Sequence, residues 1–117
     1  MKHYLMVDLG TGNSRVALVD SDGGILGLRT YTNVYHRDSA YEDGHYFLPE
    51  DWAALLLQGC RELCREHPDI QVNAVSAAGA RQSFVLLDGN GRAFLGLPNI
   101  DNRGRAYMAQ VPEHDEI

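Results

Sequence analysis

The residues best suited to chemistry lie in one short segment near the N-terminus, where an acid is followed by glycines, hydroxyls and an arginine. The segment reads Asp8-Leu9-Gly10-Thr11-Gly12-Asn13-Ser14-Arg15. Apolar residues on both sides of it predict two antiparallel strands joined by a glycine turn. Glycines can take positive φ and carry no Cβ, so the N–H groups of such a turn can lie against an anion. The segment therefore predicts a phosphate cradle.

The side chains of this turn suit the same chemistry. Asp8 can hold a hydrated Mg²⁺, which prefers carboxylate and phosphate oxygens. Arg15 can neutralise phosphate charge, and the side chains of Thr11, Asn13 and Ser14 offer further donors. The alternative is an ordinary tight hairpin with polar turn residues, and the order of acid, glycines, hydroxyls and arginine favours the cradle.

The pattern around the turn predicts the elements that position it. Three antiparallel strands open the chain, and the third covers residues 25–34. The polar stretch 36–47 has no period and is predicted to be a surface loop. A helix is expected over 49–67, with proline and acids at its start and arginines near its end. The nearly continuous apolar run 70–78 is typical of a central strand buried on both faces.

The remainder of the chain is predicted to contain a hairpin over residues 83–97, which turns at Gly89-Asn90-Gly91. A polar turn follows at 98–103, and a helix begins within 104–110. No repeat, low-complexity tract or linker marks a domain boundary, and 117 residues suggest one domain at most.

Two cysteines of the predicted helix raise the question of a metal site. Cys60, Cys64 and His67 could line one helical face as three ligands. Together with Trp52, Leu56 and Leu63, however, they fall on a single stripe at helical spacing, which favours reduced cysteines packed in a core. A disulfide between them is disfavoured, because residues four apart on a helix suit its geometry poorly and a reducing compartment is expected.

Composition excludes several classes of protein. The formal net charge of −6 argues against a nucleic-acid partner, which requires a basic face. No stretch is apolar and long enough to span a bilayer, and the N-terminus enters a strand without a signal-peptide pattern. We therefore expect no nucleic-acid or membrane partner and a cytoplasmic location.

The order of elements, with an acid and glycines in the first turn, resembles the start of the ribonuclease-H-like fold of the actin and sugar kinase superfamily. The segment Asp8 to Arg15 is similar to the D-x-G-T-x-x-x-R opening of the FGGY carbohydrate kinases, which include glycerol kinase, xylulokinase, gluconokinase and autoinducer-2 kinase. Two later segments resemble that family's buried strand with its substrate-contacting dipeptide and its W-x-D-x-R segment. They are Val75-Ser76-Ala77-Ala78-Gly79-Ala80-Arg81-Gln82, followed by Val85-Leu86-Leu87-Asp88, and Pro98-Asn99-Ile100-Asp101-Asn102-Arg103.

This resemblance implies an α/β fold of the actin-like ATPase type, with a mixed sheet that begins with three antiparallel strands. Residues 1–117 would be the first part of the kinase N-terminal domain, and the C-terminal nucleotide-binding domain would be absent from this chain. The catalytic aspartate would lie beyond Ile117, so no catalytic residue is assigned here and the chain alone is expected to be inactive.

The resemblance also implies a site for ATP and Mg²⁺ as cofactors. Asp8 would place the metal, and the residues that face the ATP phosphates would be Thr11, Gly12, Asn13 and Arg15. Arg81, Gln82 and Asp101 would contact the carbohydrate substrate, although an internal ion pair between Asp101 and Arg103 is an equal alternative. His45, near an acidic position of the family, is left out of the site.

Two residues depart from the family's pattern at positions that would report the substrate. Gln82 stands where glycerol kinase and autoinducer-2 kinase have glutamate, and Asn99 stands where many members have tryptophan. The first change removes a charge and adds donors, and the second removes an aromatic wall. The identity of the sugar therefore does not follow from the sequence.

The resulting hypothesis is ATP-dependent phosphorylation of a small sugar, polyol or sugar acid by the complete protein. A non-catalytic, actin-like nucleotide-binding module is the alternative. A two-metal nuclease using Asp8 and Asp20 is disfavoured by the acidic composition and the glycine turn. Apolar sheet surface left uncovered in so short a chain favours self-association, a homodimer included.

Overall fold

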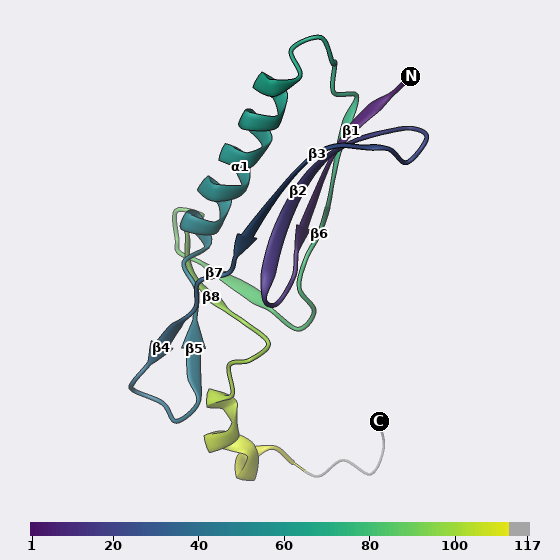
Figure 1. Ribbon diagram of the computed structural model, residues 1–117. Helices are drawn as coiled ribbons and strands as arrows, with labels where there is room; N and C mark the ends of the chain where they lie inside the picture. Colours follow the sequence, from purple (N-terminus) through teal and green to yellow (C-terminus); the bar gives the residue numbers. More distant parts are fainter. Residues whose placement is uncertain (113–117) are drawn as a thin grey trace.

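The computed structural model describes residues 1–112 and contains one mixed sheet, one long helix and two separate hairpins (Figure 1). The four strands of the sheet lie in the order β3-β2-β1-β6. The predicted α/β fold, with three antiparallel strands first, is confirmed. In chain order the elements are β1 (His3–Leu9), β2 (Asn13–Asp20), β3 (Ile25–Thr32), β4 (His36–Asp38), β5 (Gly44–Tyr46), α1 (Pro49–Glu66), β6 (Ala74–Ala78), β7 (Phe84–Leu87), β8 (Ala93–Leu97) and the 3-10 helix η1 (Arg103–Gln110).

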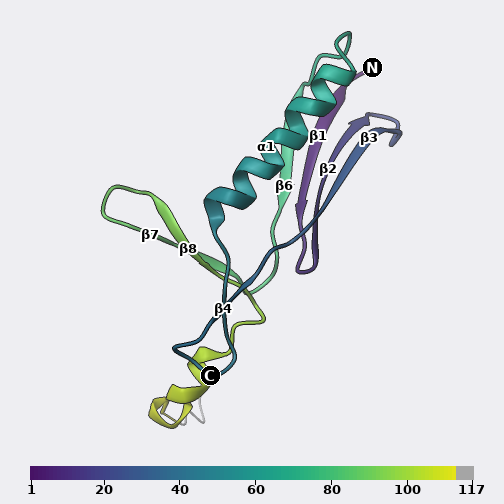
Figure 2. The same cartoon turned by 60° about the vertical axis from the view of Figure 1, so that its left-hand side comes forward.

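The core lies between one face of the sheet and α1, which runs along that face (Figure 2). Its buried members are Leu5, Val16, Leu18 and Leu63, and Leu63 is 0% exposed. Successive residues of a strand point to opposite faces, so apolar residues at alternate positions of β1 and β2 face the helix. Asp8 belongs to the other set and is exposed on the opposite face.

The helix begins and ends where the sequence predicts. Pro49 occupies its first turn, Glu50 and Asp51 lie near the positive end of the helix dipole, and Arg65 lies near the negative end. The predicted core stripe is confirmed at Leu63 but wrong at Cys64, which is exposed. The buried residues of α1 are Gly59 and Leu63, and Glu62 and Glu66 of its last turns pair with Arg29 of β3.

The stretch predicted as an irregular surface loop is instead a short antiparallel hairpin, β4–β5. Its register pairs His36 with Tyr46 and Asp38 with Gly44. The stretch has no apolar alternation because neither of its faces packs on the core. Contacts with Asp101 and Arg103, which are distant in sequence, stabilise this hairpin.

β6 differs from the expected central strand. It pairs in parallel with β1 but forms the edge of the sheet, and all five of its residues are exposed. Val75, for example, is 63% exposed. No element within residues 1–112 pairs with its outer edge. The apolar side chains that predict burial are therefore not covered by any of the described residues.

Residues 1–112 contain neither a membrane-spanning helix nor a cluster of metal-ligating side chains. No helix among residues 1–112 combines the length and the apolar character needed to cross a membrane. In the same part of the chain, no group of three or more histidine, cysteine, aspartate or glutamate side chains is placed to hold a metal ion. Cys60, Cys64 and His67 therefore do not form a three-ligand site.

Leu63 should carry a large share of the stability of this small core. We expect Leu63→Ala to lower the free energy of unfolding of the complete protein by roughly 2–5 kcal/mol, because it removes buried methyl groups and leaves a cavity. Urea unfolding followed by circular dichroism measures the change. Leu57→Ala on the same helix, where the side chain is 54% exposed, is the control and should cost less than about 1 kcal/mol. Equal losses would contradict the described core.

Candidate functional site

The turn between β1 and β2 has its carbonyl groups held from one side. Asn33 Nδ2 donates to the carbonyl of Gly10 at 2.6 Å and to that of Thr11 at 3.1 Å. The backbone N–H of Asn33 donates to the carbonyl of Gly12 at 2.9 Å, and the Tyr35 hydroxyl also donates to the carbonyl of Thr11. Residues just after β3 therefore fix the orientation of the three peptide groups of the turn.

The N–H groups of the turn are arranged differently from its carbonyls. Gly10 N–H donates to the carbonyl of Asn13 at 3.0 Å and closes the turn. Within residues 1–112, the N–H groups of Thr11 and Gly12 donate to no protein acceptor, and both residues are exposed. Tied carbonyls with free N–H groups give the polarity that an anion site requires.

Of the two glycines in this turn, Gly10 is required by a close backbone approach. Neither Gly10 nor Gly12 has positive φ, which among the glycines of residues 1–112 occurs at Gly23 and Gly91. A Cβ on Gly10 would lie 2.7 Å from the carbonyl oxygen of Asn13, so this position requires glycine. Gly12 has open space at the corresponding point.

Ser14 does not serve as the phosphate donor that the sequence suggested. Its side chain is buried, at 4% exposure, and its hydroxyl donates to Asn33 Oδ1 at 2.6 Å. That bond positions the amide of Asn33, whose Nδ2 then reaches the turn. Ser14 thus supports the turn from beneath, on the face of β2 that points into the core.

Asp8 and Arg15 are direct cross-strand partners on β1 and β2. Both are exposed on the sheet face opposite α1, next to the glycine turn. Opposed cross-strand residues have Cβ atoms about 4.5–5.5 Å apart. The structure therefore brings the predicted metal-placing carboxylate and the predicted phosphate-binding guanidinium together on one surface.

The predicted substrate dipeptide lies at the same end of the sheet as the glycine turn, because β6 runs parallel to β1. The register sets Ala78 opposite Asp8, so the loop after β6 begins where β1 ends (Figure 1). Arg81 and Gln82 lie in this loop and are exposed. Gln82 has φ 56°, a left-handed conformation that costs a non-glycine residue roughly 1–2 kcal/mol. Such backbone strain is concentrated at binding sites.

Hydrogen bonds join the two halves of the candidate site. Asn99 Nδ2 donates to Thr11 Oγ1 at 3.0 Å, and Asn99 N–H donates to Ser83 Oγ at 3.1 Å. The Ser83 hydroxyl in turn donates to the carbonyl of Arg81 at 3.4 Å. The glycine turn and the loop that carries Arg81 are therefore connected through two polar side chains.

An apolar pocket of about 330 Å³ lies beside these two loops, between the first turns of α1 and the start of β7. Part of its wall is an aromatic cluster in which the rings of Phe47 and Trp52 stack with centroids 4.2 Å apart, and Tyr35 meets Trp52 edge-on at 5.4 Å. Ser83 also lines the pocket. The rings of Phe47 and Trp52 thus pack against Tyr35, which holds the glycine turn, and they line the same pocket as the loop after β6.

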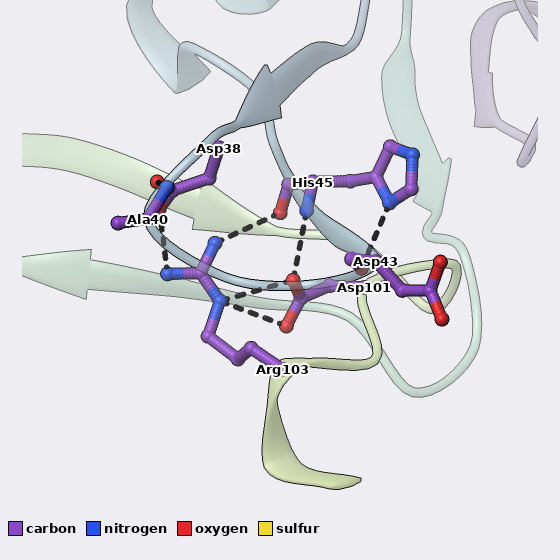
Figure 3. A network of polar contacts seen from close by, with 6 residues as sticks. All are labelled: Asp38, Ala40, Asp43, His45, Asp101 and Arg103. Atoms are coloured by element: carbon purple, nitrogen blue, oxygen red, sulfur yellow. Dashed lines mark hydrogen bonds and ion pairs between the residues drawn. The ribbon is translucent and has the colours of Figure 1, made fainter. Parts of the chain in front are cut away.

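Asp101 belongs to an ion-pair network centred on Arg103 (Figure 3). Arg103 Nε lies 3.0 Å from Asp101 Oδ1, and Arg103 Nη1 lies 2.9 Å from Asp38 Oδ2. Asp101 also accepts from the backbone N–H of His45 at 2.8 Å, and the Arg103 guanidinium stacks on Tyr41 at 4.7 Å from the ring centroid. The loop 98–103 is thereby fastened to the β4–β5 hairpin.

The charges of this network are well compensated. Burial disfavours the charged form of Arg103, but the carboxylates of Asp101 and Asp38 outweigh it and raise the pKa of Arg103. The internal ion pair, one of the two alternatives for Asp101, is therefore present. A contact between Asp101 and substrate stays a prediction. His45 contributes through its backbone groups, since its carbonyl also accepts from Arg103 at 3.3 Å.

Sequence reasoning missed the residues that hold the site in shape. Asn33 and Tyr35 orient the glycine turn from more than twenty positions away, and Ser83 links the two loops. The available signal for Asn33 was an asparagine near the end of the strand predicted over 25–34, since its side chain readily bonds backbone groups. No local pattern indicates the partners of Tyr35 or Ser83.

We expect Arg103→Gln to loosen the β4–β5 hairpin, because it removes the charge-assisted bonds to Asp101, Asp38 and the carbonyl of His45 and leaves the 9%-exposed Asp101 side chain without its counterion. Amide hydrogen exchange of residues 36–46 should accelerate by about tenfold or more in the complete protein, equivalent to about 1.4 kcal/mol. Arg105→Gln is the control, since Arg105 is 70% exposed and 3.8 Å from Asp43. Unchanged exchange in Arg103→Gln would contradict the fastening role.

Comparison with known proteins identifies the family. The chain is 42% identical over 117 residues to a Bacillus subtilis (strain 168) protein named as a sugar kinase, YoaC, covering 99% of this chain and 24% of that protein. It is 29% identical to the autoinducer-2 kinase of Salmonella choleraesuis (strain SC-B67), covering 97% of this chain and 22% of that enzyme. The chain thus spans about a quarter of the length of these relatives.

Solved structures agree on the fold. The crystal structure of a xyloylose kinase from Brucella ovis superposes with a TM-score of 0.79 at 21% identity, covering 92% of this chain and 23% of that one. Residues 3–103 match the family described as the FGGY family of carbohydrate kinases, N-terminal domain. The chain therefore belongs to the FGGY family of carbohydrate kinases and carries part of the N-terminal domain.

Proposed function

We propose that the complete protein transfers a phosphoryl group from ATP to a hydroxyl of a small sugar, polyol or sugar acid. Membership of the carbohydrate kinase family supports the reaction class. The observation that carries the proposal is that the predicted phosphate-binding groups and the predicted substrate-binding groups lie at the same end of the sheet. The glycine turn with Asp8 and Arg15 lies there, and so does the loop with Arg81 and Gln82.

The donor set of the turn fits a nucleotide phosphate. Two free N–H groups, the Thr11 hydroxyl and the Arg15 guanidinium are all donors, and phosphate oxygens are acceptors. Asn13, at the start of β2, adds an amide to this set. Asp8 would hold Mg²⁺ as a single carboxylate, because Mg²⁺ keeps several of its waters. When bound, ATP supplies the phosphoryl group and Mg²⁺ offsets the charge on its phosphates.

The chain's own residues would contribute by positioning and by charge neutralisation, which dominate catalysis of phosphoryl transfer. Arg81 and Gln82 would orient the hydroxyls of the acceptor, and Arg15 would offset the phosphate charge that develops during transfer. We assign the removal of the acceptor's proton to a residue outside this chain. Residues 1–117 alone should therefore be catalytically silent.

An ADP-release assay on the complete protein tests the proposal against a panel of pentuloses, polyols, sugar acids and the autoinducer-2 precursor, with residues 1–117 as the control. Acceptor-dependent release by the complete protein alone is the expected result, and it would name the substrate. Sugar-dependent turnover by residues 1–117 would show that the base lies within this chain. Nucleotide binding without turnover for any acceptor would favour the nucleotide-binding module instead.

Arg81 should act on the acceptor rather than on the nucleotide. We expect Arg81→Ala to raise the KM for the acceptor by about tenfold, in line with loss of a charge-assisted hydrogen bond, and to change the KM for ATP less than about twofold. Arg61→Ala, on the exposed surface of α1, is the matched control and should leave both constants unchanged. An equal rise in the two KM values would remove Arg81 from the acceptor site.

A further inference from the structure

Asn99 occupies the junction between the glycine turn and the loop after β6. Its side-chain Nδ2 donates to Thr11 Oγ1 at 3.0 Å, and its backbone N–H donates to Ser83 Oγ at 3.1 Å. The Ser83 hydroxyl donates its own hydrogen bond to the carbonyl of Arg81 at 3.4 Å. Every bond in this chain therefore has a defined direction, and Asn99 is the donor in both of its bonds.

These directions determine what the Thr11 hydroxyl can do. A hydroxyl has one proton and two lone pairs, and an amide NH₂ can only donate. Because Thr11 Oγ1 accepts from Asn99, its own proton must point to another acceptor. Within residues 1–112 no protein group accepts it, and Thr11 is exposed beside the free N–H groups of the turn. The hydroxyl is thus held as an outward donor.

We propose that Asn99 is a positioning residue that fixes the Thr11 hydroxyl as a hydrogen-bond donor to a phosphate oxygen of the bound nucleotide. This inference rests on the proposed function. Accepting one hydrogen bond strengthens the donor character of a hydroxyl, so the bond from Asn99 also polarises Thr11 toward an anion. Through Ser83 the same residue sets the distance between the glycine turn and the loop that carries Arg81.

Asn99→Asp is the sharpest test, because aspartate has nearly the same shape but its carboxylate can only accept. The Thr11 proton would turn toward residue 99, and a negative charge would be added beside the turn. We expect the Kd for ADP in the presence of Mg²⁺, measured by calorimetry on the complete protein, to rise by about tenfold or more. Asn99→Ala, which only removes the bond, should raise it about two- to fivefold.

Two controls separate hydroxyl orientation from charge. Asn90→Asp adds the same charge in the turn between β7 and β8 and should change the Kd less than about twofold. In a Thr11→Val background the hydroxyl is gone, so Asn99→Asp should raise the Kd for ADP much less than in the unsubstituted protein. The rise that remains comes from the added charge and should disappear in 0.5 M salt. In a Thr11→Ser background the effect should persist in full.

The outcomes are distinguishable. No binding of ADP by the unsubstituted protein would overturn the proposed function and this inference together. Normal binding with equal Kd values for Asn99→Asp and Asn90→Asp would overturn the inference alone. So would an effect of Asn99→Asp that is as large in the Thr11→Val background as in the unsubstituted protein. Thermal unfolding of each variant reports its folding, and the Thr11→Val comparison does not depend on small differences in stability.

Discussion

The parallel pairing of β1 with β6 is the constraint on which the candidate site depends. Parallel neighbours require a crossover, and α1 supplies it while covering the apolar face of the sheet. Because the two strands run in the same direction, their carboxyl ends lie at the same end of the sheet, with Ala78 opposite Asp8. In open α/β sheets ligands bind outside the carboxyl ends of the strands. A change of pairing would separate the glycine turn from the loop with Arg81.

Outside the small core, hydrogen bonds and ion pairs hold the segments of the chain in position. The core proper is small, and the chain extends over 58 × 34 × 28 Å with a radius of gyration of 18.2 Å, against about 13 Å for a compact domain of this length. Beyond the reach of α1, segments are held by hydrogen bonds between residues far apart in sequence. Asn33 holds the glycine turn, and Arg103 holds the β4–β5 hairpin. Self-association through exposed strands such as β6 stays a prediction.

Local patterns explain what the sequence could and could not predict. α1, the first hairpin and the β7–β8 hairpin follow from periodicity and turn residues, which act over a few positions. The phosphate-binding roles of Thr11 and Arg15 rest on a contiguous motif and remain predictions. The donor role expected of Ser14 is wrong because the strand register buries its side chain, and only the tertiary fold sets that register. The left-handed backbone at Gln82 likewise has no local signal.

The overall charge of the chain sharpens the role of the glycine turn. A formal net charge of −6 repels an anionic nucleotide at long range, so the field of the whole chain gives no help in binding. That repulsion is screened over about 8 Å at physiological ionic strength, whereas hydrogen bonds act at contact. In the proposed function, binding of a phosphate would therefore rest on short-range donors, which are the Thr11 hydroxyl, Arg15 and the two turn N–H groups that have no acceptor within residues 1–112. Orientation of each donor consequently matters more here than it would on a basic surface.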